Sequence, residues 1–385
     1  MNLQNNVYIQ QATLGKQEEI NEATSALLAL LPMAARLNAA TKVVLKPNLL
    51  AKHAPQKAVT THPSVVRAVI LALQKYGVTN ITLADSPGGL YTPASMRAIY
   101  KESGLAAVCE ETGVKLYTEC KSVMLQGSGK LVKQFEVLEP IANCDVIINL
   151  PKLKTHVMAG MSGAVKNLFG CVPGLRKAEF HMQFPQKENF GQMLVDLCET
   201  LPPQIHIVDG VLGMEGDGPG SGTPRVCNML LAGQNPYTLD LALAHYMGMN
   251  PAELPVATAA HNSGLAPLGL DMALLQPQNG ASTAPFAGFV QPRSYQGNIN
   301  FEQNAPAFLR PAVGAVTRRV APRPKIEKGL CIGCGKCAEI CPVQVISIQN
   351  KKAKIATKNC IHCFCCHEVC PVKAISVKRS RLFRV

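Results

Sequence analysis

The chain has no tryptophan, and aromatic residues make up only 5% of its 385 residues. It also lacks an apolar run near the roughly 20 residues that a membrane-spanning helix needs, because the longest candidate, residues 26–35, is interrupted by Pro32. No basic segment leads into an apolar stretch at the start, so we expect no signal peptide. These absences favour a cytoplasmic protein without a membrane span, and the 47% hydrophobic content excludes wholesale disorder.

Nucleotide-binding signatures are missing as well. No Gly-x-Gly-x-x-Gly follows an early strand. The glycine-rich stretch Gly213–Gly222 resembles an anion cradle but lacks the Gly-Lys-Ser/Thr of a phosphate-binding P-loop. A dinucleotide-binding fold is therefore not indicated.

Acidic residues are scarce in the last 75 positions, which hold 15 of the 38 basic residues but only three acids, Glu327, Glu339 and Glu368. That segment carries a net charge of +12, whereas the rest of the chain is close to neutral at +1. Such a charge would suit nucleic acid or another anionic surface. The shortage of aromatic side chains argues against nucleic acid as the partner.

Nine of the 15 cysteines lie between Cys331 and Cys370, and the other six are scattered singly, which suits a reducing compartment better than a disulfide framework. The pattern C-x2-C-x2-C-x3-C-P begins at Cys331 and again at Cys360. This spacing is typical of bacterial [4Fe–4S] proteins, in which the fourth cysteine of one run binds the other cluster. The predicted ligands are Cys331, Cys334, Cys337 and Cys370 for the first cluster and Cys341, Cys360, Cys363 and Cys366 for the second.

The two runs form an internal repeat, because they continue into the similar strings CPVQVISI from Cys341 and CPVKAISV from Cys370. Each string predicts a turn followed by a short strand. Zinc is the alternative for C-x2-C pairs, but it needs neither the third cysteine nor the repeated Cys-Pro. Cys365 is an additional thiol in the second run, and we interpret it as a residue that does not bind a cluster.

The clusters also bear on the charge of this segment. Each oxidised cluster with its four thiolates carries a net charge of about −2, so two clusters lower +12 to about +8. The remaining basic side chains are suited to docking an acidic redox partner.

Residues 1–265 alternate strand-like and helix-like segments. The predicted strands are Lys42–Lys46, Ile81–Ala84, Val146–Leu150 and Ile205–Val208, and the predicted helices are Glu19–Leu31, Pro63–Tyr76, Ala94–Glu102, Ser162–Phe169 and Asn189–Thr200. The alternation favours an α/β domain with a mixed, mainly parallel sheet and helices on both faces, followed by a small α+β iron–sulfur domain. We expect the α/β domain at residues 1–265, a proline-rich strap or linker at 266–325 and the iron–sulfur domain at 326–385.

Polar residues follow several of these strands, where an open α/β sheet places its binding sites. Each of them alone is more often a cap, a turn residue or a solvated charge, but their joint placement favours a site. Lysines suit a carboxylate or phosphate, and the acids and histidines suit proton transfer or metal binding. The candidate catalytic residues are Lys46, Asp85, Lys152, Lys154, His156 and Lys166, and the candidate substrate-binding residues are Asn48, Thr61, His62, Asn167, Asp209 and Glu215. Asp240 is predicted to open a later helix.

Seven strings occur in one order along the chain: KPNLL, TTHP, DSPGG, NLPKLKTH, SGAVKNLFG, DGVLGMEGDGP and LDLALAHYMG. In these strings the chain resembles the domain-of-unknown-function family numbered 362, over roughly residues 40–265. Members of that family often carry a C-terminal two-cluster ferredoxin module, and the segment from residue 325 resembles bacterial ferredoxins. The resemblance implies an α/β domain joined to a ferredoxin-like electron-transfer domain, without an assigned reaction.

These features lead to one principal hypothesis and two alternatives. In the principal hypothesis, two [4Fe–4S] clusters relay electrons between a redox partner protein and a small anionic substrate bound at the strand ends. In the first alternative the protein is a non-enzymatic electron carrier whose α/β domain docks a partner. In the second, the α/β domain handles a metal or assembles clusters, with a further metal held by its acids and histidines.

Overall fold

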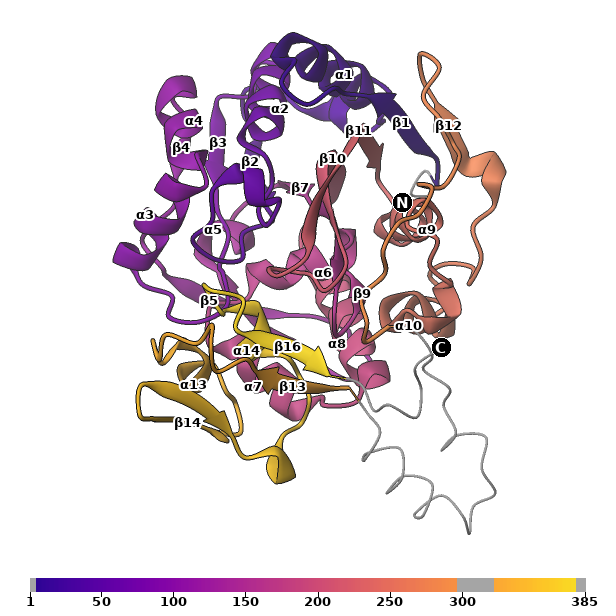
Figure 1. Ribbon diagram of the computed structural model, residues 1–385. Coiled ribbons are helices and arrows are strands. Elements are labelled where there is room, and N and C mark those ends of the chain that lie inside the picture. Colours follow the sequence, from indigo (N-terminus) through magenta and orange to yellow (C-terminus); the bar gives the residue numbers. More distant parts are fainter. Residues whose placement is uncertain (1–4, 296–321, 379–385) are drawn as a thin grey trace.

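The computed structural model describes residues 5–295, which we call the α/β domain, and residues 322–378, which we call the C-terminal module. Figure 1 shows one large sheet with helices on both faces and the smaller module lying against one end of it. None of the helices in these two ranges is long and apolar enough to span a membrane.

Parallel strands form the centre of the large sheet, in the order β10-β7-β2-β3-β4. Strands buried on both faces are nearly continuous apolar runs, as in Val43-Val44-Leu45 of β2 and in β7, whose one polar residue is Asn149. Val43 and Leu45 pack into one hydrophobic core, and Val44 packs into the core on the opposite face. The bounds are Lys42–Pro47 for β2, Asn80–Leu83 for β3, Lys115–Leu116 for β4, Val146–Leu150 for β7 and Gln204–Glu215 for β10.

The other side of the sheet is partly antiparallel. There β10 pairs with β11 (Thr223–Gly233), which pairs with β1 (Val7–Gln11), and β12 (Leu275–Pro277) adds a parallel edge. The short strands β8 (Lys152–His156) and β9 (Gly160–Met161) pair with each other, and β8 also pairs with β10. A separate hairpin is formed by β5 (Ser122–Gln126) and β6 (Gln134–Leu138).

Helices cover both faces of this sheet (Figure 1). Helix α2 shows why the sequence forms them: Pro63 occupies the first turn, Nδ1 of His62 accepts the amide of Ser64, and Val66, Ile70 and Leu73 are buried along one side. The bounds are Gln17–Ala29 (α1), Pro63–Lys75 (α2), Pro93–Glu102 (α3), Leu105–Thr112 (α4), Glu139–Ala142 (α5), Ala164–Asn167 (α6), Arg176–Gln183 (α7), Lys187–Thr200 (α8), Pro236–Tyr246 (α9) and Pro255–Asn262 (α10). Short 3-10 turns occur at Ala34–Arg36, Pro55–Lys57, Leu168–Cys171, Pro251–Glu253, Met272–Leu274 and Thr357–Asn359.

The C-terminal module consists of two small antiparallel pairs and two single-turn helices. Strand β13 (Arg323–Ile326) pairs with β16 (Ile375–Lys378), and β14 (Ile346–Gln349) pairs with β15 (Lys352–Ile355). Helices α13 (Lys336–Glu339) and α14 (Cys365–Glu368) occupy equivalent positions in the repeat. The predicted fold class is therefore confirmed, with a strand after each Cys-Pro as expected.

Three local predictions differ from the structure. The strand predicted at Ile205–Val208 continues to Glu215, because Val211, Leu212 and Met214 are buried beyond its predicted end. The glycine-rich stretch is consequently divided between the end of β10 and the hairpin connection to β11. Asp240 lies inside α9, where its carboxylate accepts the amides of Ala164 and Val165 at the start of α6.

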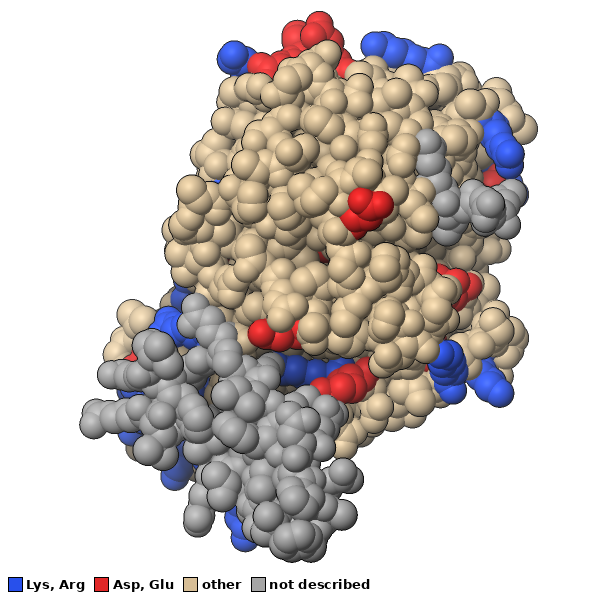
Figure 2. All heavy atoms as spheres, turned by 90° about the vertical axis from the view of Figure 1, so that its right-hand side faces the viewer, with Lys and Arg blue, Asp and Glu red and all other residues tan. Residues whose placement is uncertain are grey.

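The proline-rich segment predicted at 266–325 contributes β12 to the large sheet and most of β13 to the module, while residues 296–321 lie outside the described residues. Figure 2 shows the face of the α/β domain over β12, α9 and α10, where charged side chains are few and scattered.

Candidate functional site

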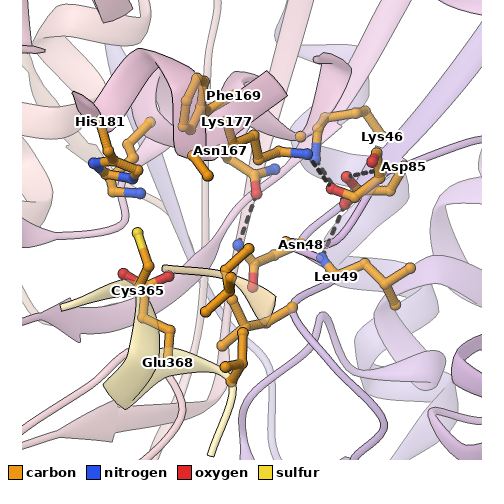
Figure 3. Close-up of a pocket in the computed structure, with 18 residues that line it drawn as sticks. Lys46, Asn48, Leu49, Asp85, Asn167, Phe169, Lys177, His181, Cys365 and Glu368 are labelled. Atoms are coloured by element: carbon orange, nitrogen blue, oxygen red, sulfur yellow. Dashed lines mark hydrogen bonds and ion pairs between the residues drawn. The ribbon is translucent and has the colours of Figure 1, made fainter. Parts of the chain in front are cut away.

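A pocket of about 650 Å³, counted with its open mouth, lies between the α/β domain and the C-terminal module (Figure 3). We call it the junction pocket. The α/β domain contributes residues that follow β2 and β3 together with residues of α6 and α7, and the module contributes residues of α14 and the end of α13. Its polar or titratable lining residues are Lys46, Asn48, Asp85, Ser86, Lys166, Asn167, Lys177, His181, Cys365 and Glu368.

A buried ion pair forms one wall of the junction pocket. Nζ of Lys46, at the end of β2, donates to Oδ2 of Asp85 over 2.7 Å, and both side chains are only 1% exposed. The Asp85 carboxylate also accepts the amides of Leu49 and Ser86 at 2.9 and 2.7 Å. Burial raises the pKa of Asp85, and the Lys46 charge opposes that shift. A side chain at Gly170 would collide with both members of the pair, so glycine is required there.

A chain of amide side chains joins the pocket to the sheet. Nδ2 of Asn48 donates to Oδ1 of Asn167 over 2.8 Å, and Nδ2 of Asn167 donates to Oδ1 of Asn149 over 2.7 Å. Oδ1 of Asn48 is buried and accepts no hydrogen bond within the described part of the chain. Asn48 is thus held in place by one end of its amide while the other end is free for a ligand.

Lys166 and His181 bring unpaired polar atoms to the side of the pocket nearest the module. Lys166 has no carboxylate within 4 Å among the described residues, and its Nζ lies 5.8 Å from the centre of the Phe169 ring. Burial lowers the pKa of Lys166. His181 stacks on Phe190 at 4.4 Å, and burial lowers its pKa to about 3, so the ring is neutral at pH 7. Nδ1 of His181 is buried without a hydrogen-bond partner in residues 5–295 and 322–378, and Figure 3 shows the sulfur of Cys365 pointing toward this ring.

His156 of β8 contacts the module directly. Its Nδ1 accepts the amides of Met158 and Ala159 at 3.1 and 3.3 Å, which places the ring proton on Nε2. That Nε2 lies 3.1 Å from Oε1 of Glu368 in α14, with the two side chains 2% and 14% exposed. Burial lowers the pKa of His156 to about 4. Burial alone would raise the pKa of Glu368, but His156 and Lys166 lower it to about 2.

Lys154, two residues before His156, is also buried. Its Nζ donates to the carbonyl oxygen of Val59 over 2.6 Å, and burial lowers its pKa well below the ordinary lysine value. The next largest influence on this pKa is Lys166, followed by the opposing charge of Glu368. Lys154 and Lys166, which were predicted to meet a substrate anion, therefore experience the charge of Glu368, a carboxylate of the same chain, without forming an ion pair with it.

The remaining candidates lie away from the junction pocket. Lys152 and Asp209 form a second buried ion pair at 2.6 Å, and Asp209 also accepts the amide of His62. Oγ1 of Thr61 donates to the carbonyl oxygen of Leu150. Glu215 pairs with Arg225 at 2.7 Å on the long hairpin. Of the twelve candidates in the α/β domain, the pocket is lined by Lys46, Asn48, Asp85, Lys166 and Asn167.

The α/β domain adds two titratable pocket residues that the sequence did not single out, both on α7. Lys177 donates to the carbonyl oxygens of Ser86, Pro87 and Val172, and burial lowers its pKa to about 7. His181 is the second. Neither follows a strand or belongs to a repeated motif, so no local pattern marks them.

The cysteines of the module fall into two spatial sets. A cavity of about 350 Å³, counted with its open mouth, has Cys331, Cys334, Cys337 and Cys370 among its lining residues. Amides point at two of these sulfurs, with Ala353 N 3.4 Å from Sγ of Cys331 and Ala374 N 3.1 Å from Sγ of Cys370. Burial raises the pKa of Cys337, and the nearby thiols of Cys334, Cys370 and Cys331 add to that rise.

The second set lies on the side of the junction pocket. Burial and the neighbouring thiols of Cys363 and Cys360 raise the pKa of Cys366 well above the ordinary value, with smaller effects from Cys337 and Cys341. The pKa of Cys360 is likewise raised by burial and by Cys363 and Cys341. Within residues 5–295 and 322–378, no three His, Cys, Asp or Glu side chains converge on a point suited to a single metal ion.

Two family matches cover most of the chain. Residues 43–245 match the family described as "Domain of unknown function (DUF362)", and residues 330–374 match "4Fe-4S dicluster domain". The chain is 33% identical over 232 residues to "Thylakoid-associated protein sll1697" of Synechocystis sp., covering 60% of this chain and 70% of that protein. It is 50% identical over 28 residues to Ferredoxin-2 of Desulfomicrobium norvegicum, covering 7% of this chain and 48% of the ferredoxin.

Two solved structures are similar in part. One is a Thermotoga maritima protein, at 13% identity with a TM-score of 0.40, covering 62% of this chain and 61% of that one. The other is the lactate racemase apoprotein of Thermoanaerobacterium thermosaccharolyticum, at 13% identity with a TM-score of 0.36, covering 64% and 57%. The family match over more than half of the sequence shows that this chain, an iron–sulfur protein with a ferredoxin-like [4Fe–4S] module, belongs to the DUF362 family.

Proposed function

We propose that this protein relays electrons through two [4Fe–4S] clusters to or from a small anionic substrate held in the junction pocket. The observation that carries the proposal is the composition of the pocket, in which strand ends of the α/β domain face residues of the second cysteine loop, residues 360–370. Cys365 lines the pocket and is the direct neighbour of Cys366 in sequence. A molecule in the pocket would therefore lie beside the loop that would hold the second cluster.

The proposed cluster ligands are two sets of four cysteines. The cavity around Cys331, Cys334, Cys337 and Cys370 and the amides directed at two of its sulfurs fit a cluster whose sulfurs accept hydrogen bonds. Cys341, Cys360, Cys363 and Cys366 are close neighbours in the second set. When bound, each cluster takes up or releases one electron, so the two clusters together supply two electrons.

The proposed substrate is an anion because cationic and neutral hydrogen-bonding groups outnumber free carboxylates in the pocket. Asp85 is already paired with Lys46, and Glu368 faces His156. Lys166 has no close carboxylate and can hold a carboxylate or other oxyanion. Nδ1 of His181 can donate to the anion when it carries the ring proton, Oδ1 of Asn48 can accept from a hydroxyl group of the substrate, and the Lys46–Asp85 pair can exchange a proton with it. His156 contacts Glu368 behind the pocket wall, and Lys154 acts on that carboxylate through its charge.

An anion-binding experiment tests this function. Anaerobically purified protein with about eight irons and eight sulfides per chain is mixed with formate, oxalate, phosphate or nitrite, and its thermal unfolding is recorded. An anion present at 100 times its dissociation constant should stabilise the protein by about 2.7 kcal/mol. Lys166→Met should lose this stabilisation while keeping its cluster spectra, and the exposed Lys75→Met on α2 should keep both.

The electron-carrier alternative gives the opposite result. If none of these anions stabilises the protein, or if Lys166→Met responds as the wild type does, the α/β domain is a docking domain and the junction pocket is only a gap in the interface. Iron analysis also addresses the metal-handling alternative, because a further stoichiometric metal would assign coordination to the acids and histidines of the α/β domain.

The setting of the reaction is part of the proposal. All six cysteines outside the module are free thiols, which supports a reducing, cytoplasmic compartment. The basic module supports an acidic redox partner.

A further inference from the structure

The first cysteine loop, residues 331–341, presents large apolar side chains to solvent. Leu330 and Ile332 are 56% and 61% exposed. Ile348 and Val372 are also exposed, and together with Ile332 they line the cavity of the first cysteine set. We call these four residues the outer patch. Single exposed apolar side chains are ordinary, but a group of them around one redox centre indicates an interaction surface.

The outer patch surrounds the most accessible point of the first cluster site. Cys334 is the one exposed cysteine among the 15, all of which lie in the described part of the chain. Cys363, its equivalent in the second loop, is only partly exposed, and the second loop is covered by the α/β domain. An electron that enters from outside therefore has its shortest route through the first loop.

Positive charge borders the outer patch. Residues 322–378 contain ten basic and three acidic side chains. Glu327 pairs with Lys325, and Glu368 faces His156. Among residues 322–378, Glu339 is therefore the one acidic side chain without such a neighbour. Lys336 lines the same cavity, and the tip of the β14–β15 hairpin, with Lys351, packs against Gly333 of the first loop. Lys336, Lys351 and Lys354 are exposed.

We propose that the outer patch is the docking site for an acidic electron-transfer protein with an apolar centre to its contact surface. The inference rests on the proposed relay and specifies the order of the two clusters in it. The first cluster exchanges electrons with the partner, and the second faces the junction pocket. In the docking step the partner's reduced cofactor loses one electron and the first cluster gains it, without transfer of an atom or proton. The lysines steer the acidic partner, and the apolar side chains exclude water at the contact.

Reduction kinetics test the docking site. The cluster-loaded full chain is mixed anaerobically with reduced flavodoxin, a small acidic electron-transfer protein, and loss of cluster absorbance is followed at low and high salt. We expect the wild-type rate to fall as salt increases. Lys351→Glu/Lys354→Glu should slow the reaction about tenfold at low salt and remove most of the salt dependence. Ile332→Ser/Val372→Ser should slow it at both salt concentrations, and Lys75→Glu on α2 should leave it unchanged.

Two controls keep the result interpretable. Each variant is first shown to contain as much iron and sulfide as the wild type, and the lysine variant lies outside both cysteine loops, so it remains available if the apolar variant loads poorly. Reduction by the methyl viologen radical, which needs no protein contact, should not be slowed in any variant.

Three results would overturn the inference. The first is an unchanged rate with flavodoxin in the lysine variant. The second is a concentration-dependent dimer, seen by sedimentation, that Ile332→Ser abolishes, because the patch would then bind a second copy of the chain. The third is failure of methyl viologen to reduce wild-type clusters, which would also contradict the relay. Anion binding in the junction pocket is measured separately and is unaffected by the first two results.

Discussion

The two cysteine loops have the same ligand spacing but face opposite surroundings. At equivalent positions Lys336 is exposed, whereas Cys365 is buried in the wall of the junction pocket. Glu339 is exposed, whereas Glu368 lies 3.1 Å from His156 of the α/β domain. The repeat thus duplicates the cysteines, and the residues between them direct one loop to solvent and the other to the pocket.

The backbone carries the same contrast. Gly333 and Gly335 of the first loop have φ of 68° and 82°, and the equivalent His362 and Phe364 adopt 55° and 59°. The left-handed region costs a residue with a side chain roughly 1–2 kcal/mol. Phe364 offsets this cost because its ring is buried with Val157 of the α/β domain and Val377. In the second loop, the contact of Phe364 with the α/β domain therefore compensates for backbone strain.

The largest expected effect separates adjacent cysteines of the second loop. Cys366→Ser should remove a ligand and leave about four irons per chain, because the first set is intact. Cys365→Ser should keep about eight. Iron and sulfide analysis with electron paramagnetic resonance measures both. Equal iron loss in the two variants would make Cys365 a ligand and would contradict the proposed sets.

A smaller effect is expected from the left-handed positions. Phe364→Gly loses a buried ring, at a cost of about 3–5 kcal/mol, and relieves about 1–2 kcal/mol of backbone strain, so we expect a net loss of about 2 kcal/mol in stability. Gly335→Ala should cost about 1 kcal/mol for conformational reasons alone, since a Cβ there meets nothing closer than 3.8 Å. Anaerobic urea unfolding measures both changes. A stabilised Phe364→Gly would show that the ring does not anchor the module.

The same contrast shows how far the sequence can be interpreted. Apolar runs such as Val146–Leu150 predict buried strands because hydrophobic burial is a local property of the chain. The cysteine spacing likewise predicts two ligand sets, since it reflects the geometry of a short loop. In contrast, Lys152 and Lys154 follow a proline and resemble a surface loop, yet both are buried in β8. Their burial depends on Asp209 and Val59, which are distant in sequence.

Glu368 was beyond prediction for a similar reason. Its string matches that of Glu339 in the repeat, and only docking of the module distinguishes the two. Residues that meet across a domain interface have no common local pattern, so the sequence could not show that a carboxylate of the same chain lies beside the predicted site.

We expect acid to lower the stability of the protein through a buried histidine beside the second cysteine loop. The folded pKa of His181 is about 3, below the ordinary value of 6.5, and the groups that face it are Glu368, Lys166 and His156. Below pH 6.5 the unfolded chain takes up a proton at this position and the folded chain does not, so stability falls as pH falls. The loss is about 2 kcal/mol between pH 6.5 and 5. Residues 331–341 contain no histidine, so the first loop has no equivalent group.

A matched pair of variants measures this pH dependence. His181→Phe keeps the stacking on Phe190 without a titratable group, so its urea midpoint should depend less on pH than that of the wild type. The exposed His261→Gln is the control and should keep the wild-type slope. A slope unchanged in His181→Phe would mean that other groups cause the acid sensitivity.

The smallest expected effect is the most direct test of the repeat. Glu368→Gln keeps the shape of the side chain beside His156 but removes the charge that acts on Lys166 and Lys154, so it should cost about 1 kcal/mol. Glu339→Gln changes an exposed side chain at the equivalent position and should cost less than about 0.5 kcal/mol. Both variants lose one negative charge. Comparing their urea unfolding under the same conditions therefore removes the effect of net charge on stability. Equal destabilisation would mean that docking does not depend on the Glu368 carboxylate, and the second loop would then be held by Phe364 and the surrounding apolar contacts alone.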